Sequence, residues 1–376
     1  MKRRQFFTNL PLGAAGLGLA GSCSFSTNKD HQKDNKPESL NQKGSVPAYR
    51  NKIKHTFNQD NQKSAKDRVM LALIGAGGWG TNLILNAVGI NRNVYVKYIC
   101  DVDDTRGGRA IVELEKIQGK RPARVRDMRL VFDDPEVNGV IIATPQHWHG
   151  LATIWACQAG KDVYVEKCVS FNIREGQKMI EAAMKDERII QCGMQNRSSD
   201  YALNARNFIK EGILGQVVGG NVMGLLNGPV PFREKEGEKA PDSIDWDMWL
   251  GPAPDAPFSV SRNKSWGYYW DYSGGYALAN GSIHQMDLAR LVLDDPGFPK
   301  SVYCTGGRYL FEDQRDIPDY QMTVFDYEDF ALSLQTGEFT PYMLKSSPEI
   351  RHGDGLPEWK QNSTKIVIYG TEGLMY

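Results

Sequence analysis

The sequence predicts an α/β protein in which an N-terminal, doubly wound parallel sheet is followed by a second α/β domain. Two observations support the first domain. Apolar segments of strand length alternate with helical segments between residues 67 and 195. The first of them, RVMLALI, runs directly into glycines spaced as Gly75-x-Gly77-x-x-Gly80. Uninterrupted apolar strands are typical of a parallel sheet that is covered on both faces.

The alternation specifies the elements in order. After the first strand, TNLILNAVG (81–89) predicts a short helix, and VYVKYIC (94–100) predicts the second strand. A helix is expected within DDTRGGRAIVELEKIQ (103–118). The remaining expected strands are 137–144, 161–168 and 188–195, and the remaining helices are 151–160 and 174–187. Farther along, β-rich composition predicts strands at 217–226, 301–307, 320–328 and 330–338, and IHQMDLARLVL (283–293) predicts a helix.

The glycine triplet predicts a dinucleotide site. The first glycine permits a tight turn, the second admits a pyrophosphate close to the backbone, and the third lets helix and strand pack closely. The phosphates would lie at the positive end of the following helix. The expected cofactor-binding residues of this turn are Gly75, Gly77, Gly78, Trp79 and Gly80.

Asp101 ends the second strand, 26 residues after Gly75, near the spacing of a ribose-binding carboxylate. A carboxylate there favours NAD because it repels a 2′-phosphate, although the nearby Arg106 leaves NADP open. The alternative interpretation is that Asp101 caps the following helix.

Ligands of such sheets bind beyond the carboxyl ends of the strands, where this sequence places polar and reactive side chains. These ends are Gly75–Gly80, Asp101, Thr144–His149, Glu166–Cys168 and Gln195–Arg197. His147 and His149 are two residues apart, which suggests a metal site. No third ligand is evident nearby, so we favour a turn that contacts the cofactor and predict no metal.

The N-terminal segment MKRRQFFTNL predicts export. Its basic start, apolar middle and small-residue end indicate a secretory signal, and Arg3-Arg4 resembles a twin-arginine address for folded proteins. The alternative is a basic N-terminus of a cytoplasmic protein. Cys23 resembles a lipid-acylation site, but Ala20 stands where that pattern usually has leucine. We therefore expect a signal at 1–23, a disordered linker at 24–66 and a periplasmic protein, with membrane anchoring through Cys23 left open.

The composition bears on nucleic-acid binding and on the state of the cysteines. The chain balances 45 basic against 45 acidic residues and has no basic block beyond its start, so nucleic-acid binding is not expected. Cys100, Cys157, Cys168 and Cys192 lie in or beside apolar segments. They are expected to be buried thiols rather than disulfides.

The ordered set GAGGWG, CDVD, ATPQHWH, VEKC and GMQNR resembles the Gfo/Idh/MocA oxidoreductases, and the resemblance extends over residues 67–376. It implies a Rossmann domain at 67–195 and a substrate and oligomerisation domain at 196–376 with a large, open, mostly antiparallel sheet. The segment KIVIYGTEGLMY resembles a family hairpin that normally leads into further structure, which favours truncation at Tyr376. A homodimer or homotetramer is a further implication.

The resemblance also implies site residues. Lys167, in Glu166-Lys167-Cys168 where the family usually has Glu-Lys-Pro, corresponds to the catalytic lysine, and His284 to the histidine of proton transfer. A partly desolvated lysine beside a cationic ring has a lowered pKa, which suits proton transfer. Asn280 replaces a frequent family aspartate, and this substitution shifts proton transfer toward Lys167 and His284. The other expected contacts to cofactor are Thr144, Pro145, His149, Glu166 and Gln195, and those to substrate are Arg197, Asn280, Asp287 and Trp266.

We therefore expect a tightly bound NAD, or NADP, and hydride transfer from a secondary alcohol of a sugar or glycoside. A folded protein can load its cofactor before export, and a retained cofactor must be recycled on the enzyme. Two alternatives stay open. One is an NAD-dependent, redox-assisted glycosidase, which departs from the two-carboxylate scheme. The other is a non-catalytic sugar-binding protein on the same fold. Trp246 and Trp249 lie in an aromatic-rich stretch whose rings would suit stacking on a sugar. For these two residues we favour the alternative that they pack beneath the long loops.

Overall fold

A computed structural model describes residues 68–90, 93–226, 234–235, 237–275, 282–339 and 364–376, all of which belong to one compact unit. The predicted signal, the predicted linker, Cys23 and Asn280 lie outside these residues. Among the described residues, no helix combines the length and apolar character needed to cross a membrane. The described cysteines carry free thiols. Cys100 and Cys157 are buried as expected, whereas Cys168 and Cys192 are only partly buried, so the expectation was wrong for these two.

The first sheet is entirely parallel and has the strand order β3-β2-β1-β4-β5-β6. Because β1 pairs with both β2 and β4, the strand order reverses there, and parallel sheets place their ligand crevice at such a switch point. The strands are β1 (Val69–Ile74), β2 (Val94–Cys100), β3 (Ala123–Val125), β4 (Gly139–Ile142), β5 (Asp162–Val165) and β6 (Ile190–Cys192).

The connecting helices confirm the predicted alternation. They are α2 (Gly78–Ile90), α3 (Gly108–Gln118), α4 (Met128–Phe132), α5 (His149–Gln158) and α6 (Ile173–Lys185), with 3-10 turns η3 (Gln146–Trp148) and η4 (Gln195–Ser198). The sequence analysis missed β3 and α4, because three residues that include an arginine and a five-residue helix are too short to show a period.

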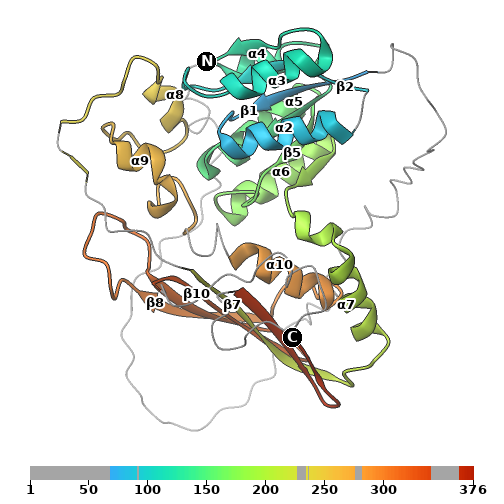
Figure 1. Ribbon diagram of the computed structural model, residues 1–376. Coiled ribbons are helices and arrows are strands. Elements are labelled where there is room, and N and C mark those ends of the chain that lie inside the picture. The colour runs from blue at the N-terminus through green and yellow to red at the C-terminus, as the bar shows by residue number, and fades with distance from the viewer. Residues whose placement is uncertain (1–67, 91–92, 227–233, 236, 276–281, 340–363) are drawn as a thin grey trace, which may run out of the picture. The chain divides into compact units, whose positions relative to one another are not determined.

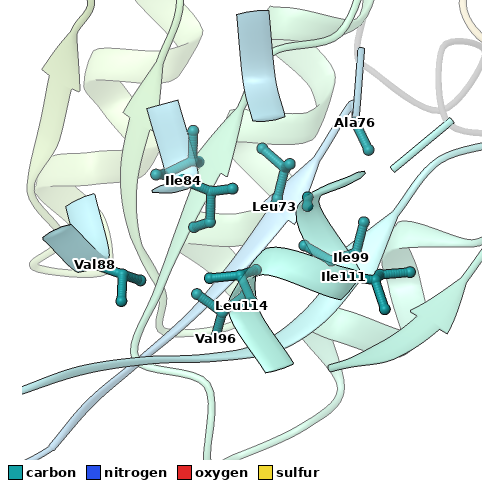
Figure 2. Close-up of a cluster of buried hydrophobic side chains, with 10 residues drawn as sticks. Leu73, Ala76, Ile84, Val88, Val96, Ile99, Ile111 and Leu114 are labelled. Carbon is teal, nitrogen blue, oxygen red and sulfur yellow. The ribbon is translucent and has the colours of Figure 1, made fainter. Parts of the chain in front are cut away.

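The core of this domain lies between the sheet and two helices. Leu73 of β1 and Val96 and Ile99 of β2 meet Ile84 of α2 and Leu114 of α3, and all five are fully buried (Figure 2). Alternate residues of the same strands, such as Ala72, are also buried. Burial on both sides explains why the central strands are mostly apolar, and the parallel pairing places their carboxyl ends at one edge.

The second sheet is mixed and mostly antiparallel, with the order β12-β11-β7-β10-β9-β8, and among its described strands only β7 and β10 pair in parallel. In Figure 1 this sheet, labelled at β7, β8 and β10, lies below α10. This confirms the expected large sheet. Its strands are β7 (Val217–Leu226), β8 (Ser301–Gly307), β9 (Tyr320–Asp326), β10 (Ala331–Glu338), β11 (Thr364–Gly370) and β12 (Leu374–Met375).

Helices cover one face of this sheet. Met286 and Ala289 of α10 (Ile283–Val292) pack against Val222 and Leu332 in a buried cluster, and α7 (Asp200–Lys210) adds Ile209 at its margin. Helix α7 was not predicted from the sequence. Short segments between the sheets form α8 (Trp246–Leu250), α9 (Val260–Lys264) and η5 (Trp266–Tyr268).

The start of α10 is held by the second sheet. The Ser282 and Thr336 hydroxyl oxygens lie 2.6 Å apart, and Ser282 is fully buried. Gly224 of β7 pairs with Thr336 of β10, and a Cβ at Gly224 would lie 2.1 Å from Ser282 Oγ. The absence of a side chain at Gly224 therefore sets how closely the helix that carries His284 approaches the sheet.

Replacing Gly224 by Ala should lower the free energy of unfolding by about 1–3 kcal/mol, because the new methyl group displaces Ser282. Gly89→Ala is the control: its Cβ would meet nothing within 4 Å, and alanine in helix α2 should be neutral or stabilising. Urea denaturation of both variants measures the difference. Equal unfolding midpoints would show that the packing around Ser282 is loose.

Candidate active site

The glycine-rich turn between β1 and α2 lies against the end of β4. Gly75 has φ +89°, and a Cβ there would lie 2.6 Å from the Ala143 carbonyl and 2.7 Å from Thr144 N. At Gly80 a Cβ would lie 2.1 Å from the Gly75 carbonyl oxygen. Around Gly77 and Gly78, by contrast, added methyl groups would meet no described atom within 4 Å. Gly75 and Gly80 serve packing, whereas Gly77 and Gly78 leave open space over the helix start.

Asp101 joins the end of β2 to that turn. Its carboxylate accepts hydrogen bonds from the backbone N–H of Ala76 at 2.7 Å and of Asp103 at 2.9 Å. Burial raises the pKa of Asp101, and these backbone donors act in the opposite direction. Helix α3 begins after Gly107, so the alternative in which Asp101 caps this helix is wrong. Each carboxylate oxygen can accept a further hydrogen bond.

The arginines that follow β2 already have partners. Arg106 Nε lies 3.4 Å from an Asp103 carboxylate oxygen. Arg124 donates to the Asp103 carbonyl at 2.7 Å, and Arg126 pairs with Asp104. These guanidinium groups are therefore engaged by acidic side chains and carbonyl oxygens at the end of β2.

His149 connects the ends of β4 and β5. Its Nδ1 lies 2.7 Å from the Cys168 carbonyl oxygen and its Nε2 lies 2.9 Å from the Thr144 carbonyl oxygen. A neutral imidazole can donate only one of these hydrogen bonds, and burial lowers the pKa of His149. The residue predicted to contact cofactor therefore holds two backbone segments of the crevice together. Pro145 precedes η3, beside Thr144.

Glu166 and Lys167 follow β5 at the same edge. The Tyr164 hydroxyl donates to Glu166 Oε1 at 3.1 Å, and the Lys167 backbone N–H donates to Glu166 Oε2 at 3.2 Å. Glu166 is 5% exposed. Burial is the main cause that lowers the pKa of the Lys167 ammonium. A lysine in this state can exchange a proton with a substrate hydroxyl more readily than a solvated one.

His147 packs against Trp249 and Tyr272 of the second domain. It is 3% exposed, and its Nε2 lies 3.0 Å from the Trp249 carbonyl oxygen, which also accepts from Trp148 Nε1 at 3.0 Å. Burial lowers the pKa of His147 to about 4. Among the described residues, no group of three His, Cys, Asp or Glu side chains is arranged to hold a metal ion.

A segment of the second domain, Ser243–Gly275, lies along the crevice edge of the first sheet. Asp245 N donates to the Val102 carbonyl at 3.0 Å, and Asp104 N donates to the Ser243 carbonyl at 2.9 Å. At β4, Gln146 binds the Ser170 carbonyl and the Gly274 N–H. Gln146 lies within the predicted strand end Thr144–His149, but no individual role was predicted for it from the sequence.

The aromatic residues of this segment form a cluster. Trp246 and Trp249 stack at 4.5 Å, and Trp249 is 7% exposed, as the preference for packing predicted. Trp266 is half-buried against the same cluster, which also contains Tyr268 and Tyr272. Its predicted contact with substrate stays a prediction.

Arg197 and Asp287, two predicted substrate contacts, bind each other. Arg197 Nε lies 2.8 and 2.9 Å from the two Asp287 carboxylate oxygens, and its terminal nitrogens contact Asp295 at 2.7 and 3.1 Å. Gln195 lies in the same 3-10 turn, η4. His284 is the second residue of α10, three before Asp287. Asp295 was missed because nothing in its local sequence marks it as a partner of Arg197.

These residues fit a dinucleotide. The space at Gly77 and Gly78 opens at the start of α2, where backbone N–H groups can bind phosphate. Asp101 lies at the neighbouring strand end, as a ribose partner must. The buried Thr144 hydroxyl has no hydrogen-bond partner among the described residues. Lys167 and Glu166 complete the edge beyond β5.

The family comparisons agree with this geometry. Residues 69–194 match the Gfo/Idh/MocA family described as "Oxidoreductase family, NAD-binding Rossmann fold", and residues 230–339 match its "C-terminal alpha/beta domain". The chain belongs to the Gfo/Idh/MocA oxidoreductase family, and its first domain is an NAD-binding Rossmann domain.

Curated relatives include sugar and polyol enzymes. Scyllo-inositol 2-dehydrogenase (NAD(+)) of Bacillus subtilis is 28% identical over 73% of this chain and 69% of its own length. Levoglucosan dehydrogenase of Pseudarthrobacter phenanthrenivorans is 28% identical over 45% of this chain, which spans 36% of that protein. A glycosyl hydrolase family 109 protein of Shewanella putrefaciens is 25% identical over 41% of this chain and 34% of its own length.

A solved structure supports the fold. GenD2 from gentamicin A biosynthesis, in complex with NAD, superposes with a TM-score of 0.59 at 18% identity over 84% of this chain and 73% of that chain. At this sequence identity the similarity establishes only the fold of the two domains.

Two glycine substitutions should separate cofactor binding from folding. Gly77→Ala should weaken NAD binding at least about tenfold with little loss of stability, because its methyl group enters only the cofactor space. Gly80→Ala should destabilise the domain, because its methyl group strikes the Gly75 carbonyl. Calorimetric titration and thermal unfolding measure the two effects. Unchanged NAD affinity in Gly77→Ala would contradict the cofactor placement.

His147 should make stability depend on pH. Its pKa is about 4 in the folded protein and 6.5 as an ordinary value, so the unfolded chain binds the proton more tightly. The stability associated with neutral His147 is complete above pH 6.5 and is lost as the pH falls toward 4. Between pH 7 and 5 the loss is about 2 kcal/mol. His147→Gln should flatten this part of the urea-measured profile, and parallel profiles would contradict the assignment.

Proposed function

We propose that this protein is an NAD-dependent oxidoreductase that acts on a secondary alcohol of a sugar, glycoside or related polyol. The observation that carries the proposal is the desolvated Lys167 beside Glu166, at the same sheet edge as the open glycine turn. Family membership and the inositol and levoglucosan dehydrogenases among the relatives support this reaction class.

Each residue of the site has a separate role in the proposed reaction. Gly77 and Gly78 admit the cofactor phosphates, Asp101 binds a ribose hydroxyl, and Thr144 lines the crevice. A bound nicotinamide supplies the hydride acceptor. Lys167 accepts the proton of the substrate hydroxyl as the carbonyl forms, and Glu166 orients the lysine backbone. His284 assists the proton transfer from the second domain.

The proposal favours NAD over NADP. A 2′-phosphate at the end of β2 would approach the Asp101 carboxylate, and the arginines next to it are paired with Asp103 and Asp104. A 2′-phosphate would therefore have to compete with these carboxylates for the arginines.

Export of a folded protein and a retained cofactor complete the proposal. Under the twin-arginine interpretation of Arg3-Arg4, NAD is loaded before export to the periplasm, and Cys23 provides an optional lipid anchor. The face of the second sheet that no described helix covers supports a homo-oligomer, because Tyr303, Met322 and Tyr369 are each more than a third exposed there.

A redox-assisted glycosidase is the second candidate, favoured by the glycosyl hydrolase family 109 relative. In that reaction a transient ketone acidifies the neighbouring C–H and permits elimination of the glycosidic substituent. The third candidate is a sugar-binding protein that does not turn over. Such a protein would have the dehydrogenase fold but would not catalyse hydride transfer.

Cofactor analysis followed by a Lys167 variant tests the proposal. Denaturing the protein purified without added nucleotide should release about one NAD per chain, identified by mass spectrometry. Inositols, levoglucosan and simple glycosides should then be screened for reduction of the bound cofactor. Lys167→Met should retain NAD but slow reduction by about 10²–10⁴-fold, whereas Lys178→Met, in an exposed pair with Glu181, should not.

Three outcomes distinguish the candidates. Release of a new reducing end without net reduction supports the glycosidase. Sugar binding without any reduction supports the binding protein. Full activity in Lys167→Met removes the lysine from the mechanism.

A further inference from the structure

We infer that Arg197 is a positioning residue that fixes the helix carrying His284 to the end of the first sheet, and so sets the relation between His284 and Lys167. The inference rests on the proposed function for its catalytic meaning. It assigns Arg197 no contact with substrate, which revises the expectation from the sequence.

The contact geometry supports a fixed orientation. Arg197 makes four N–H···O contacts of 2.7–3.1 Å, two to Asp287 on α10 and two to Asp295 just beyond the helix. The side chains of Arg197, Asp287 and Asp295 are 30%, 15% and 22% exposed. Planar, multidentate arginine pairs with this little exposure restrict orientation more than surface ion pairs do.

The far end of α10 shows that its position is constrained. Asp294 and Asp295 follow the helix with φ of 63° and 52°, in the left-handed region. Left-handed L-residues other than glycine are strained and persist only where surrounding contacts hold them. Arg197 holds Asp295, while Arg206 and Lys210 of α7 hold Asp294.

The chain that leads from β6 to Arg197 packs against Glu166, next to Lys167. Arg197 lies in η4, four residues after Gly193, which follows β6. A Cβ at Gly193 would lie 2.7 Å from both Glu166 Oε1 and the Tyr164 hydroxyl, so the chain is closely packed against Glu166 there. Glu166 in turn accepts from the Lys167 backbone.

On the helix, Asp287 is one turn after His284, so both side chains project from one face. The path from Lys167 to His284 therefore runs through the contacts at Glu166 and Asp287, which are joined by the chain from Gly193 to Arg197 and by one turn of α10. Arg197 is the ion-paired link between α10 and the connection that leaves β6 of the first sheet. A displacement of about 1 Å between reacting groups can cost about 10²-fold in rate.

The test compares Arg197→Met and Arg197→Lys with Arg206→Met. Arg206 is the matched control because it pairs with Asp294 rather than with Asp287 or Asp295, and because Lys210 still binds Asp294 when Arg206 is replaced. Each protein is loaded with NAD. The rate of cofactor reduction at saturating substrate, the NAD affinity and deuterium exchange over α10 are then measured, with the best substrate from the screen above.

We expect Arg197→Met to lower the saturating rate by about 10–100-fold while NAD affinity stays within about twofold. Arg197→Lys should recover only part of the rate, because an ammonium cannot bind both carboxylates in the same plane. Exchange over α10 should rise in Arg197→Met and remain unchanged in Arg206→Met, whose rate should match the wild type. A saturating rate in Arg197→Met equal to that of Arg206→Met overturns the inference.

Failure of the proposed function is recognised separately. In that case no protein, including the wild type, reduces its cofactor, and deuterium exchange alone decides whether Arg197 fixes α10. Unchanged exchange in Arg197→Met then overturns the inference. A selective rise over α10 supports it as a structural constraint on a binding site.

Discussion

The close approach of the Gly75 turn to the end of β4 is the contact around which the active site is arranged. No side chain fits at Gly75 or Gly80, because one would enter the β4 backbone and the other the Gly75 carbonyl. This packing brings the start of α2, the end of β2 and the end of β4 to one edge. Asp101 then binds the turn through Ala76 N, and the cofactor space at Gly77 remains open.

Buried polar residues hold this edge together. His149 joins Thr144 to Cys168, Glu166 joins Tyr164 to Lys167, and Gln146 joins Ser170 to Gly274. In each case a side chain satisfies backbone groups that strand ends leave unpaired, and an unpaired buried group would be costly. The residues with the strongest functional appearance in the sequence therefore divide into those that face the open space and those that support it.

The second domain covers the strand ends of the first sheet and orients helix α10. The Ser243–Gly275 segment is hydrogen-bonded to the ends of β2 and β4, and the Trp249 carbonyl accepts from both His147 and Trp148. The α10 helix is positioned from two directions, by Ser282 against Thr336 at its start and by Arg197 beyond its middle. In the proposed mechanism the proton-transfer groups come from two domains, and such connections would then be needed because the reacting atoms tolerate little displacement.

The sequence by itself determined the parallel sheet, the glycine turn, the strand ends that bear polar residues and most strands of the second sheet. These features follow from local periodicity, since apolar strands and glycine turns are encoded by neighbouring residues. Only the tertiary structure decided the roles of His147, His149 and Arg197. Their partners, Trp249, Cys168, Asp287 and Asp295, lie 19 to 102 residues away or are backbone carbonyls without a sequence signature. Histidine and arginine have the same appearance in a sequence whether they bind a ligand or a distant backbone, and burial and partner geometry distinguish the two.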